Sequence, residues 1–439
     1  MQKLLVSAVL LGSASALHVP VTSRSRPITM GTAADDMGIP CVGECDLPSY
    51  PKLPPSVHPG VVTGQALMDL LKDAKEKGYA IPAVNCVTSS SVNACLEAAR
   101  KADAPIMIQF SSGGAQFYAG KGLDNKDYTA AIAGAVSGAY HVRAMAEQYG
   151  VPVVLHTDHC AKKLLPWMDG MLAASERYYK MHGEPLFSSH MLDLSEEPLE
   201  ENIDICVEYM ERMAKMDMLL EMELGITGGE EDGVNNEDAN QEDLYTKPEE
   251  VWAVTKALMK VPNAKFTIAA AFGNVHGVYA PGNVKLTPKI LKNSQAYISE
   301  QLGMPQGSMP VSFVFHGGSG SDINDIRESI GYGVIKMNID TDTQWSYWDG
   351  IRAYEKENRD YLQGQIGNPE GADKPNKKYY DPRMPIRAAE KACAKRLMQA
   401  FEDLKCVGVL GLGDSKEPSN VLASSVYREA GARKGALPV

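Results

Sequence analysis

Three histidines of this sequence stand at or just beyond the ends of apolar runs. His159 closes VPVVLHTDH, His276 follows FTIAAAFGNV, and His316 follows VSFVF. Three neutral imidazoles from different elements are a usual donor set for a catalytic zinc ion, which keeps one coordination position open for substrate. Because the three are far apart in sequence, a zinc site requires a fold that brings them together. For any one of them, a buried histidine with satisfied hydrogen bonds is the alternative.

Other polar residues end the remaining apolar runs. Each run is interpreted as a strand, and the polar residues at the run ends include Asn85, Ser111, Asp158, Asp193, Glu223, Asn338 and Asp340. Carboxylates in such places can bind a metal ion or transfer protons. Ser111, Asp193 and Asp340 could instead serve only as caps of the helices that follow. Polar groups at so many equivalent positions favour a functional site over a set of caps.

Glycine-rich segments beside two of the histidines indicate a binding site for phosphate. Backbone N–H groups and hydroxyls that precede a helix form a cradle for an anion, and barrels commonly hold phosphate near their last two strands. The turn HGGSGS has this character, although a tight turn without a ligand is the alternative. The residues that could contribute donors to an anion are those of the turn 316–321, Gly277 after His276, and residues 338–341 near the end of the last run.

The segment 226–243, ITGGEEDGVNNEDANQED, is acidic and rich in glycine. Gly228 and Gly229 would let it hinge, and Glu230 or Glu231 behind the hinge could be delivered to the site as a proton-transfer base. A solvated surface loop is the alternative. A Lewis-acid zinc ion, a mobile carboxylate and phosphate cradles together fit one reaction, the formation and stabilisation of an enediolate from a phosphorylated ketose.

Eight apolar runs alternate with amphipathic stretches, a pattern that predicts a (β/α)8 barrel of the TIM type. Catalytic groups of such barrels lie at the carboxyl ends of the strands, which is where the polar residues stand. A doubly wound open sheet is the alternative. The predicted strands are 79–86, 104–112, 151–159, 186–194, 218–225, 266–273, 311–318 and 332–340.

The composition is that of a globular chain with a large core. The chain has 439 residues, 44% of them hydrophobic, and a formal net charge of −12. An excess of negative charge argues against nucleic acid or an anionic membrane as the main partner, but leaves room for a local basic pocket. The eight cysteines include no C-x-x-C pair, so we expect most of them to be reduced.

The two ends of the chain differ from the middle. Residues 1–16 have an early lysine, an apolar stretch and small residues, the layout of a secretory signal peptide. Residues 17–55 begin with a segment rich in Ser, Thr and Arg and end as a proline-containing linker. The two together resemble the two-part presequence of proteins that enter plastids through the secretory path, with ordinary secretion as the alternative. We expect the barrel at 56–407 and a C-terminal extension at 408–439.

From about Val57 to about Val407, the chain resembles the class II, zinc-dependent fructose-bisphosphate aldolases of the class IIA type. The resemblance rests on PAVNC, QFSSGGAQFYAGKG, VPVVLHTDHCAKKLLPW, PLFSSHMLDLSEE, ELGITGGEEDGV, FGNVHGVYAPGNV, VFHGGSGS and PNKKYYDPR. It implies a (β/α)8 barrel that reversibly cleaves fructose 1,6-bisphosphate to dihydroxyacetone phosphate and glyceraldehyde 3-phosphate. It also implies zinc as cofactor, with a monovalent cation, Na⁺ or K⁺, near the phosphate loop.

The resemblance assigns a role to each candidate residue. Asp158 would act on the C4 oxygen, Glu231 would exchange the proton on the dihydroxyacetone phosphate carbon, and Asn338 would steady the enediolate. The zinc ligands implied are His159, His276 and His316, with Glu223 at an alternative metal position and Asp193 near it. The residues implied to hold the substrate and its phosphates are Asn85, Ser111, Gly277, Gly317, Ser319, Asp340, Thr341 and Arg383.

Residues 368–383, NPEGADKPNKKYYDPR, are rich in Pro, Gly and Lys, which predicts an extended arm rather than a packed helix. Such an arm can reach a second subunit. In the family resembled, the matching arginine enters the partner's site, so we expect a homodimer that shares Arg383 across its interface. A solvent-exposed Arg383 without this role is the alternative.

Other activities remain open at this point. A tagatose-bisphosphate aldolase would share the zinc ion, the loops and the phosphates, and would differ in the stereochemistry accepted at C4. A zinc hydrolase would leave the paired phosphate sites without use, and a sugar-phosphate-binding barrel without activity would need neither Asp158 nor Glu231. An aldolase that forms a Schiff base on Lys162, Lys163 or Lys336 is the mechanistic alternative.

Overall fold

The computed structural model of the chain describes residues 49–225, 228–231, 234–236, 245–276 and 286–413. The expected signal peptide, nearly all of the transit-like segment and linker, and most of the C-terminal extension lie outside the described residues, as does Gly277. No helix among the described residues is both long and apolar enough to span a membrane.

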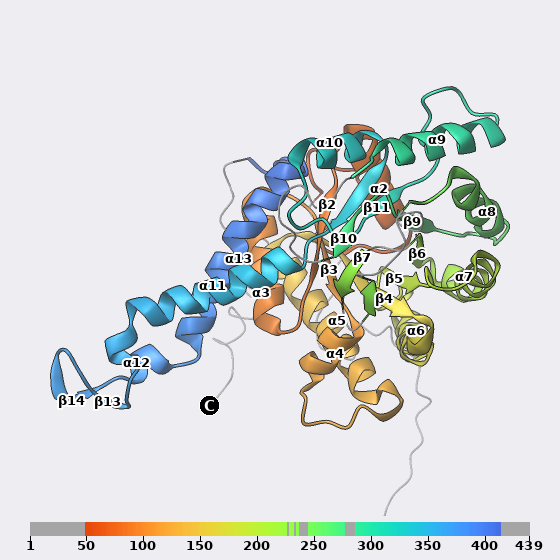
Figure 1. Ribbon diagram of the computed structural model, residues 1–439. Coiled ribbons are helices and arrows are strands. Elements are labelled where there is room, and N and C mark those ends of the chain that lie inside the picture. Colours follow the sequence, from red (N-terminus) through yellow and green to blue (C-terminus); the bar gives the residue numbers. More distant parts are fainter. Residues whose placement is uncertain (1–48, 226–227, 232–233, 237–244, 277–285, 414–439) are drawn as a thin grey trace, which may run out of the picture. The chain divides into compact units, whose positions relative to one another are not determined.

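Eight parallel strands close into a barrel at the centre of the described structure (Figure 1). Their order around the barrel is β4-β3-β2-β12-β11-β9-β6-β5, and β5 pairs again with β4. The prediction of a (β/α)8 barrel is therefore confirmed. The open sheet is excluded because β5, at one end of this order, pairs with β4 at the other end. The strands are β2 (Ile81–Asn85), β3 (Ile106–Phe110), β4 (Pro152–Ala161), β5 (Ser189–Asp193), β6 (Leu219–Leu224), β9 (Phe266–Ala270), β11 (Phe313–Phe315) and β12 (Val334–Asn338).

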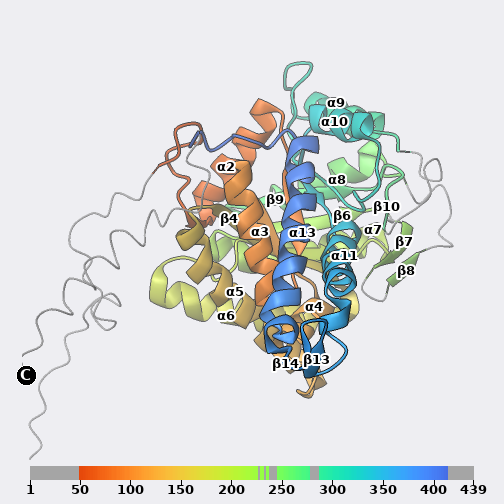
Figure 2. The same cartoon turned by 90° about the vertical axis from the view of Figure 1, so that its left-hand side faces the viewer.

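Helices separate the strands in sequence and surround the barrel (Figure 2). They are α2 (Gly64–Lys77), α3 (Ser89–Ala102), α4 (Ser112–Ala119), α5 (Thr129–Tyr149), α6 (Leu165–His182), α7 (Leu199–Met213), α8 (Pro248–Leu258), α9 (Lys289–Gln301), α10 (Ile323–Gly331), α11 (Thr341–Glu357) and α13 (Arg383–Asp403). Sequence reasoning expects Ser89 or Ser90 to cap α3. The cap is instead Thr88, whose extended backbone lets its hydroxyl accept the N–H of Ser91.

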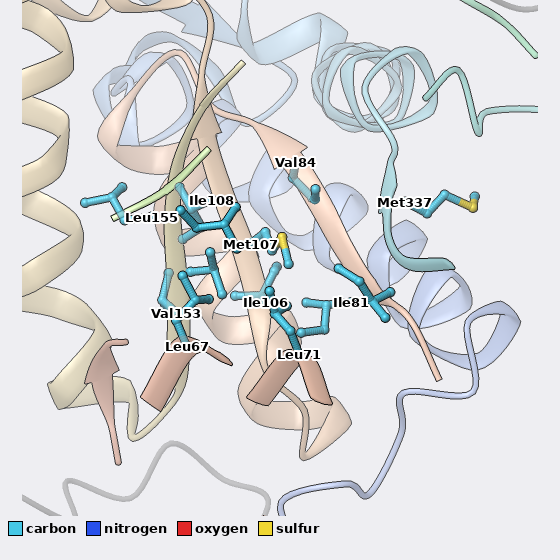
Figure 3. Packing of buried hydrophobic residues seen from close by; sticks show 14 of the residues in the cluster. Leu67, Leu71, Ile81, Val84, Ile106, Met107, Ile108, Val153, Leu155 and Met337 are labelled. Atoms are coloured by element: carbon cyan, nitrogen blue, oxygen red, sulfur yellow. The ribbon is translucent and has the colours of Figure 1, made fainter. Parts of the chain in front are cut away.

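The barrel strands are buried on both faces because side chains fill the interior and the helices cover the outside. Figure 3 shows aliphatic side chains of neighbouring strands in contact, among them Ile81, Ile106, Ile108, Val153 and Leu155, all 0% exposed. Burying each such side chain contributes about 1.5–3 kcal/mol. Between these apolar residues, several strands also carry buried polar side chains, among them Gln109, Glu221 and Lys336, which are described below.

Segments from the two ends of the described chain meet at the barrel. The Lys52 N–H donates to the carbonyl of Leu410 over 3.3 Å, and the Lys52 ammonium donates to the carbonyl of Gly408 over 3.1 Å. The Tyr50 hydroxyl donates to the carbonyl of Gly150 over 2.9 Å, and Tyr50 and Leu53 pack into the core. Residues 49–53 and 408–410, outside the boundaries expected for the barrel, thus pack as part of it.

The segment between α11 and α13 projects from the barrel as an arm (Figure 1). It contains a β-hairpin of β13 (Ile366–Asn368) and β14 (Gly371–Pro375), followed by the one-turn helix α12 (Lys377–Tyr380). The expectation of an extended arm rather than a packed helix therefore holds for the hairpin, whereas residues 377–380 depart from it by forming one helical turn. Buried Asn376 explains the order, because its side-chain amide donates to the carbonyls of Gly364 and Gly367 and fixes the base of the hairpin.

The six cysteines of the described residues are all buried and free, as expected. The sulfur atoms of two of them, Cys86 and Cys95, lie 3.7 Å apart, a distance that is too long for a disulfide bond.

Candidate active site

The carboxyl ends of the barrel strands bring several predicted residues together. The ligand atoms that Asp158, His159 and His316 can offer all lie within 4.8 Å of one another. The same limit holds for His159, Asp193 and Glu223. Four of the strands supply these residues, since β4 carries Asp158 and His159, β5 and β6 carry the other carboxylates, and His316 follows β11. Only barrel closure makes residues so distant in sequence neighbours.

A local irregularity in β4 presents His159. The register between β4 and β5 shifts between Thr157 and Cys160, and His159 has φ 38°, in the left-handed region. Such a backbone costs about 1–3 kcal/mol in a residue other than glycine and is typical of functional sites. The His159 Nδ1 lies 3.0 Å from Asp193 Oδ2, and its ring centre lies 4.7 Å from that of His316.

The charges around the two histidines are coupled. Burial on its own would raise the pKa of Asp193, but the hydrogen bond and charge of His159 outweigh it and hold that pKa below its usual range. Burial likewise opposes the charged form of His316, yet the carboxylates of Glu223 and Glu221 prevail and raise its pKa to about 9. The cluster therefore has an excess of carboxylate charge that attracts a cation.

Asp158 is held in one orientation. It is 0% exposed, and the Gln109 amide donates to its Oδ2 over 2.7 Å. The Asn338 amide, at the end of β12, donates to Asp158 Oδ1 over 3.2 Å. A carboxylate with two amide donors is fixed in position while keeping lone pairs for a further partner. Sequence reasoning missed Gln109, although a glutamine within the otherwise apolar run IMIQF was a usable signal.

Two further residues lie inside the barrel, one of them absent from the sequence predictions and the other considered there only as a Schiff-base nucleophile. Glu221 of β6 and Lys336 of β12 are each 1% exposed, and the Lys336 ammonium donates to both carboxylate oxygens. A paired, buried ammonium is not placed to attack a substrate carbonyl, which removes Lys336 from the Schiff-base alternative. Lys162 and Lys163 are exposed, and Lys162 pairs with Glu197 and Glu201.

The acidic segment is described in part by its backbone. The strands β7 (Gly228–Glu231) and β8 (Val234–Asn236) form an antiparallel hairpin. This part of the segment is therefore a pair of strands, whereas the sequence predicted a loop that hinges at Gly228 and Gly229. The hairpin pairs with β10 (Val275–His276), with Gly229 opposite His276. The hairpin that carries Glu231 is thus hydrogen-bonded to the strand that carries His276. The side chains of these two residues lie outside the described structure.

The turn after His316 packs against the start of α11. Gly317 has φ 59°, and Gly318 donates its N–H to the carbonyl of Asn338. A Cβ on Gly318 would lie 2.6 Å from Met337 Cε, so the close approach requires glycine. The Ser319 hydroxyl accepts the N–H of Asp342 over 3.3 Å. The positive end of α11 and this turn together suit an anion.

Two further predicted residues open onto one cavity beside this helix. Asn85 ends β2, and Ser111 caps α4 by accepting the N–H of Gly114. Both line a cavity of about 380 Å³, which also contacts Asp340 at the N-terminal end of α11. The polar residues at the ends of β2, β3 and β12 therefore share one space.

Arg383 stands apart from the other predicted residues. It begins α13 at the end of the arm, its side chain is 87% exposed, and its guanidinium lies 2.6 Å from Asp381, also on the arm. That ion pair raises the pKa of Arg383 and lowers that of Asp381 to about 2. Within one chain, Arg383 is not part of the cluster around Asp158.

The donor set fits a zinc ion. Two imidazoles with carboxylates within ligand distance, at the mouth of a buried barrel, match the N and O ligands that zinc takes in catalytic sites. The backbone pairing of His276 with the hairpin allows a third imidazole but leaves its side chain undescribed. The described residues thus provide at least two of the three histidines predicted from sequence.

Comparison with known proteins agrees with this site. Residues 65–409 match the family model of class II fructose-bisphosphate aldolase. The chain is 60% identical over 361 residues to the fructose-bisphosphate aldolase of Haemophilus influenzae, covering 82% of this chain and 99% of that protein. It is 58% identical over 355 residues to the class 2 fructose-bisphosphate aldolase of Escherichia coli K12, covering 81% of this chain and 98% of that protein.

A crystal structure of the fructose-bisphosphate aldolase from Campylobacter jejuni is similar with a TM-score of 0.72 and 56% identity. The match covers 80% of this chain and 97% of that one. With its closed barrel, its cluster of histidines and carboxylates and these matches over nearly the whole length of the relatives, the chain belongs to the class II fructose-bisphosphate aldolases.

Proposed function

We propose that the chain reversibly cleaves fructose 1,6-bisphosphate to dihydroxyacetone phosphate and glyceraldehyde 3-phosphate. The observation that carries this proposal is the meeting of Asp158, His159 and His316 at one end of the closed barrel. The glycine-rich turn at the start of α11 adds an anion site beside them. Class II aldolases are zinc-dependent, and the donor set suits that ion.

The metal would be held by His159, His276 and His316, with Glu223 as ligand of an alternative position next to Asp193. When bound there, zinc supplies a Lewis acid that withdraws electrons from the substrate carbonyl. The excess carboxylate charge around His159 and His316 supports this assignment. A monovalent cation near the phosphate turn is a further expectation.

Asp158 is the proposed base for the C4 hydroxyl. In cleavage, it takes the proton from that oxygen, the C3–C4 bond breaks, and its electron pair stays on the three-carbon phosphate half as an enediolate. Asn338 steadies that enediolate, and Glu231 returns a proton to its carbon. The two amide donors on Asp158 support its role because they fix the carboxylate without consuming all of its lone pairs.

The two phosphates would lie on different sides of the reacting carbons. The residues proposed for the dihydroxyacetone phosphate side are Gly277, Gly317, Ser319, Asp340 and Thr341. Asn85 and Ser111 line the cavity at the ends of β2 and β3, which supports a place for the aldehyde half. The second phosphate would also need a cation, for which Arg383 is the candidate.

We infer that this cation arrives from a second subunit. Arg383 is exposed on a projecting arm, and the arm and its neighbouring helices carry exposed large apolar side chains, which is typical of an interaction surface. These side chains are Trp345, Trp348, Ile366, Tyr380, Met384 and Ile386. A homodimer would cover them and bring Arg383 of one subunit to the barrel mouth of the other.

A coupled assay that follows glyceraldehyde 3-phosphate release tests the activity. We expect turnover of fructose 1,6-bisphosphate, little turnover of tagatose 1,6-bisphosphate, and loss of both after treatment with a chelator. Faster turnover of the tagatose compound would replace the assignment with its stereochemical alternative. Full activity after exhaustive chelation would reject zinc catalysis.

The place of the protein in the cell remains a prediction from its first 55 residues, which we propose direct it to a plastid. A fluorescent protein fused behind residues 1–55 should enter plastids in an algal cell with complex plastids. Export of the fusion to the medium would favour secretion instead.

A further inference from the structure

The barrel interior contains a charged pair that the reaction scheme above does not use. Lys336 Nζ lies 2.7 Å and 2.9 Å from the two carboxylate oxygens of Glu221, and both residues are 1% exposed. A buried ion pair adds little stability on its own, because losing water costs each charge about as much as the pair regains. A contribution to fold stability is therefore a weak explanation for this pair.

Glu221 also contacts one of the proposed zinc ligands. Its Oε1 lies 3.0 Å from His316 Nε2, whereas His316 Nδ1 lies 3.4 Å from Glu223. A carboxylate that is ionised beside an ammonium can only accept hydrogen bonds. In the neutral ring that a metal ligand requires, the proton of His316 is then on Nε2, which leaves Nδ1 as the nitrogen turned toward Glu223 and the metal cluster.

We propose that Glu221, oriented by Lys336, is a positioning residue that fixes the ring and the tautomer of His316 so that Nδ1 receives the zinc ion. This inference rests on the proposed role of His316 as a ligand. A carboxylate on the far nitrogen of a ligating histidine both orients the ring and increases its basicity. Lys336 completes the arrangement because it keeps the carboxylate ionised and in one rotamer.

The other neighbour of Glu221 does not compete for its oxygens. His156 Nε2 lies 3.7 Å from Glu221 Oε2, which is too long for a hydrogen bond. The His156 Nδ1 instead contacts the Ser189 hydroxyl at 2.8 Å. Ligand atoms of His156, Asp158 and Glu221 lie within 4.8 Å of one another, so they could form a second metal site by distance alone. The Lys336 ammonium opposes a divalent cation there.

Two variants test the proposal by zinc affinity, measured in competition with a chromogenic chelator. Glu221→Gln should weaken zinc binding roughly 10–100-fold, the usual effect of losing such a partner of a metal ligand. The visible spectrum of the cobalt-substituted protein should change as well. Asp73→Asn is the matched control, because Asp73 is also a largely buried carboxylate paired with a lysine, Lys77, but lies on α2.

The double variant E221M/K336M separates positioning from charge balance. Removing both charges restores neutrality with side chains of similar length, so the protein should fold and unfold much like the unsubstituted chain. Its zinc affinity should remain roughly 10–100-fold low, because no acceptor holds the His316 Nε2 proton. Zinc affinity equal to that of the unsubstituted chain would overturn the proposal and leave the pair a structural one.

The two proposals fail in different ways. If His316 is not a ligand, then His316→Ala keeps normal zinc affinity, which rejects the metal assignment itself. If His316→Ala loses zinc while Glu221→Gln and E221M/K336M keep it, only the positioning role is wrong. Two zinc ions per chain, with one lost in Glu221→Gln, would favour the second metal site and would also contradict the proposal.

Discussion

The mouth of the barrel and the projecting arm place their polar residues in opposite ways. At the mouth, Asp158 and His316 are at most 1% exposed, and each is fixed by a hydrogen bond with a residue of another strand. On the arm, the Arg383 side chain is 87% exposed and pairs only locally with Asp381 among its described ion pairs. The comparison teaches that one chain is enough to bring the polar residues of the mouth together, whereas the same chain leaves Arg383 exposed and away from them.

Loss of a ligand at the mouth should have the largest effect. His159→Ala is expected to remove bound zinc and nearly all turnover while leaving the barrel folded, because the neighbouring strands pack through their apolar side chains. Turnover, metal content and thermal unfolding measure these three points. His182→Ala, on the outer helix α6, is the control and should keep activity. Normal turnover in a zinc-free His159→Ala protein would show that the mouth does not act through a metal.

Complementation tests whether the arm serves a second subunit. Asp158→Ala and Arg383→Ala are each expected to be nearly inactive. After dissociation and random reassociation of equal amounts, half of the dimers are mixed, and each mixed dimer holds one complete site out of two. Activity should therefore return to about a quarter of the unsubstituted level, given a two-fold symmetric dimer.

The same mixture has a clear negative outcome. If Arg383 acts within its own subunit, every site lacks either the aspartate or the arginine, and the mixture stays inactive. Light scattering before and after mixing supplies the control that dimers form.

Loss of Glu231 should affect one step and leave the mouth intact. Glu231→Ala is expected to bind zinc and substrate but to lose most exchange of the dihydroxyacetone phosphate proton with solvent, because a base is missing rather than the Lewis acid. Exchange is measured by NMR in deuterated water. Glu230→Ala is the matched control, since Glu230 is the neighbouring carboxylate of the same acidic segment. Equal exchange in both variants would mean that the hairpin contributes no base.

The smallest effect on activity is expected for a substitution in the glycine-rich turn that follows His316. Gly318→Ala would bring a methyl group within 2.6 Å of Met337 and 2.8 Å of the Asn338 carbonyl, so the turn must shift. We expect KM for the bisphosphate to rise several-fold with a smaller change in kcat, as measured by steady-state kinetics. Gly331→Ala, where an added methyl meets no atom within 4 Å, should leave both constants unchanged. A KM unaffected by Gly318→Ala would argue against a phosphate at this turn.

The fold was predictable because each strand is marked by an apolar run within its own short stretch of sequence. Each barrel strand lies in a predicted apolar run, apart from two residues by which β4 extends beyond 159. The meeting of His159 and His316 followed from the barrel, since its strand ends share one rim. Gln109 and Glu221 were missed, and Lys336 was considered only as a Schiff-base nucleophile. The role of a polar residue within a strand depends on which side faces inward, and only barrel closure decides that. The roles of individual residues stay predictions.

The arm and the cap of α3 were predicted less well for a different reason. Composition indicated correctly that residues 368–383 do not belong to the barrel, but the hairpin depends on Asn376, whose two carbonyl acceptors lie 9 and 12 positions earlier. The periodicity of hydrophobic residues in a sequence does not reveal contacts at such spacing. Among several neighbouring hydroxyl residues, the choice of Thr88 as cap depends on its backbone angles, which the sequence does not display.

The contact between Lys52 and residues 408–410 has a consequence for the order of assembly in the cell. The two partners of its ammonium bond are 356 positions apart, so this bond can form only after nearly the whole chain has been made. The Tyr50 hydroxyl donates to the carbonyl of Gly150, and the Lys77 ammonium donates to the carbonyl of Lys52, so the same segment can already be held by residues made much earlier. The bond from Lys52 to Gly408 is therefore among the last contacts of the barrel to form.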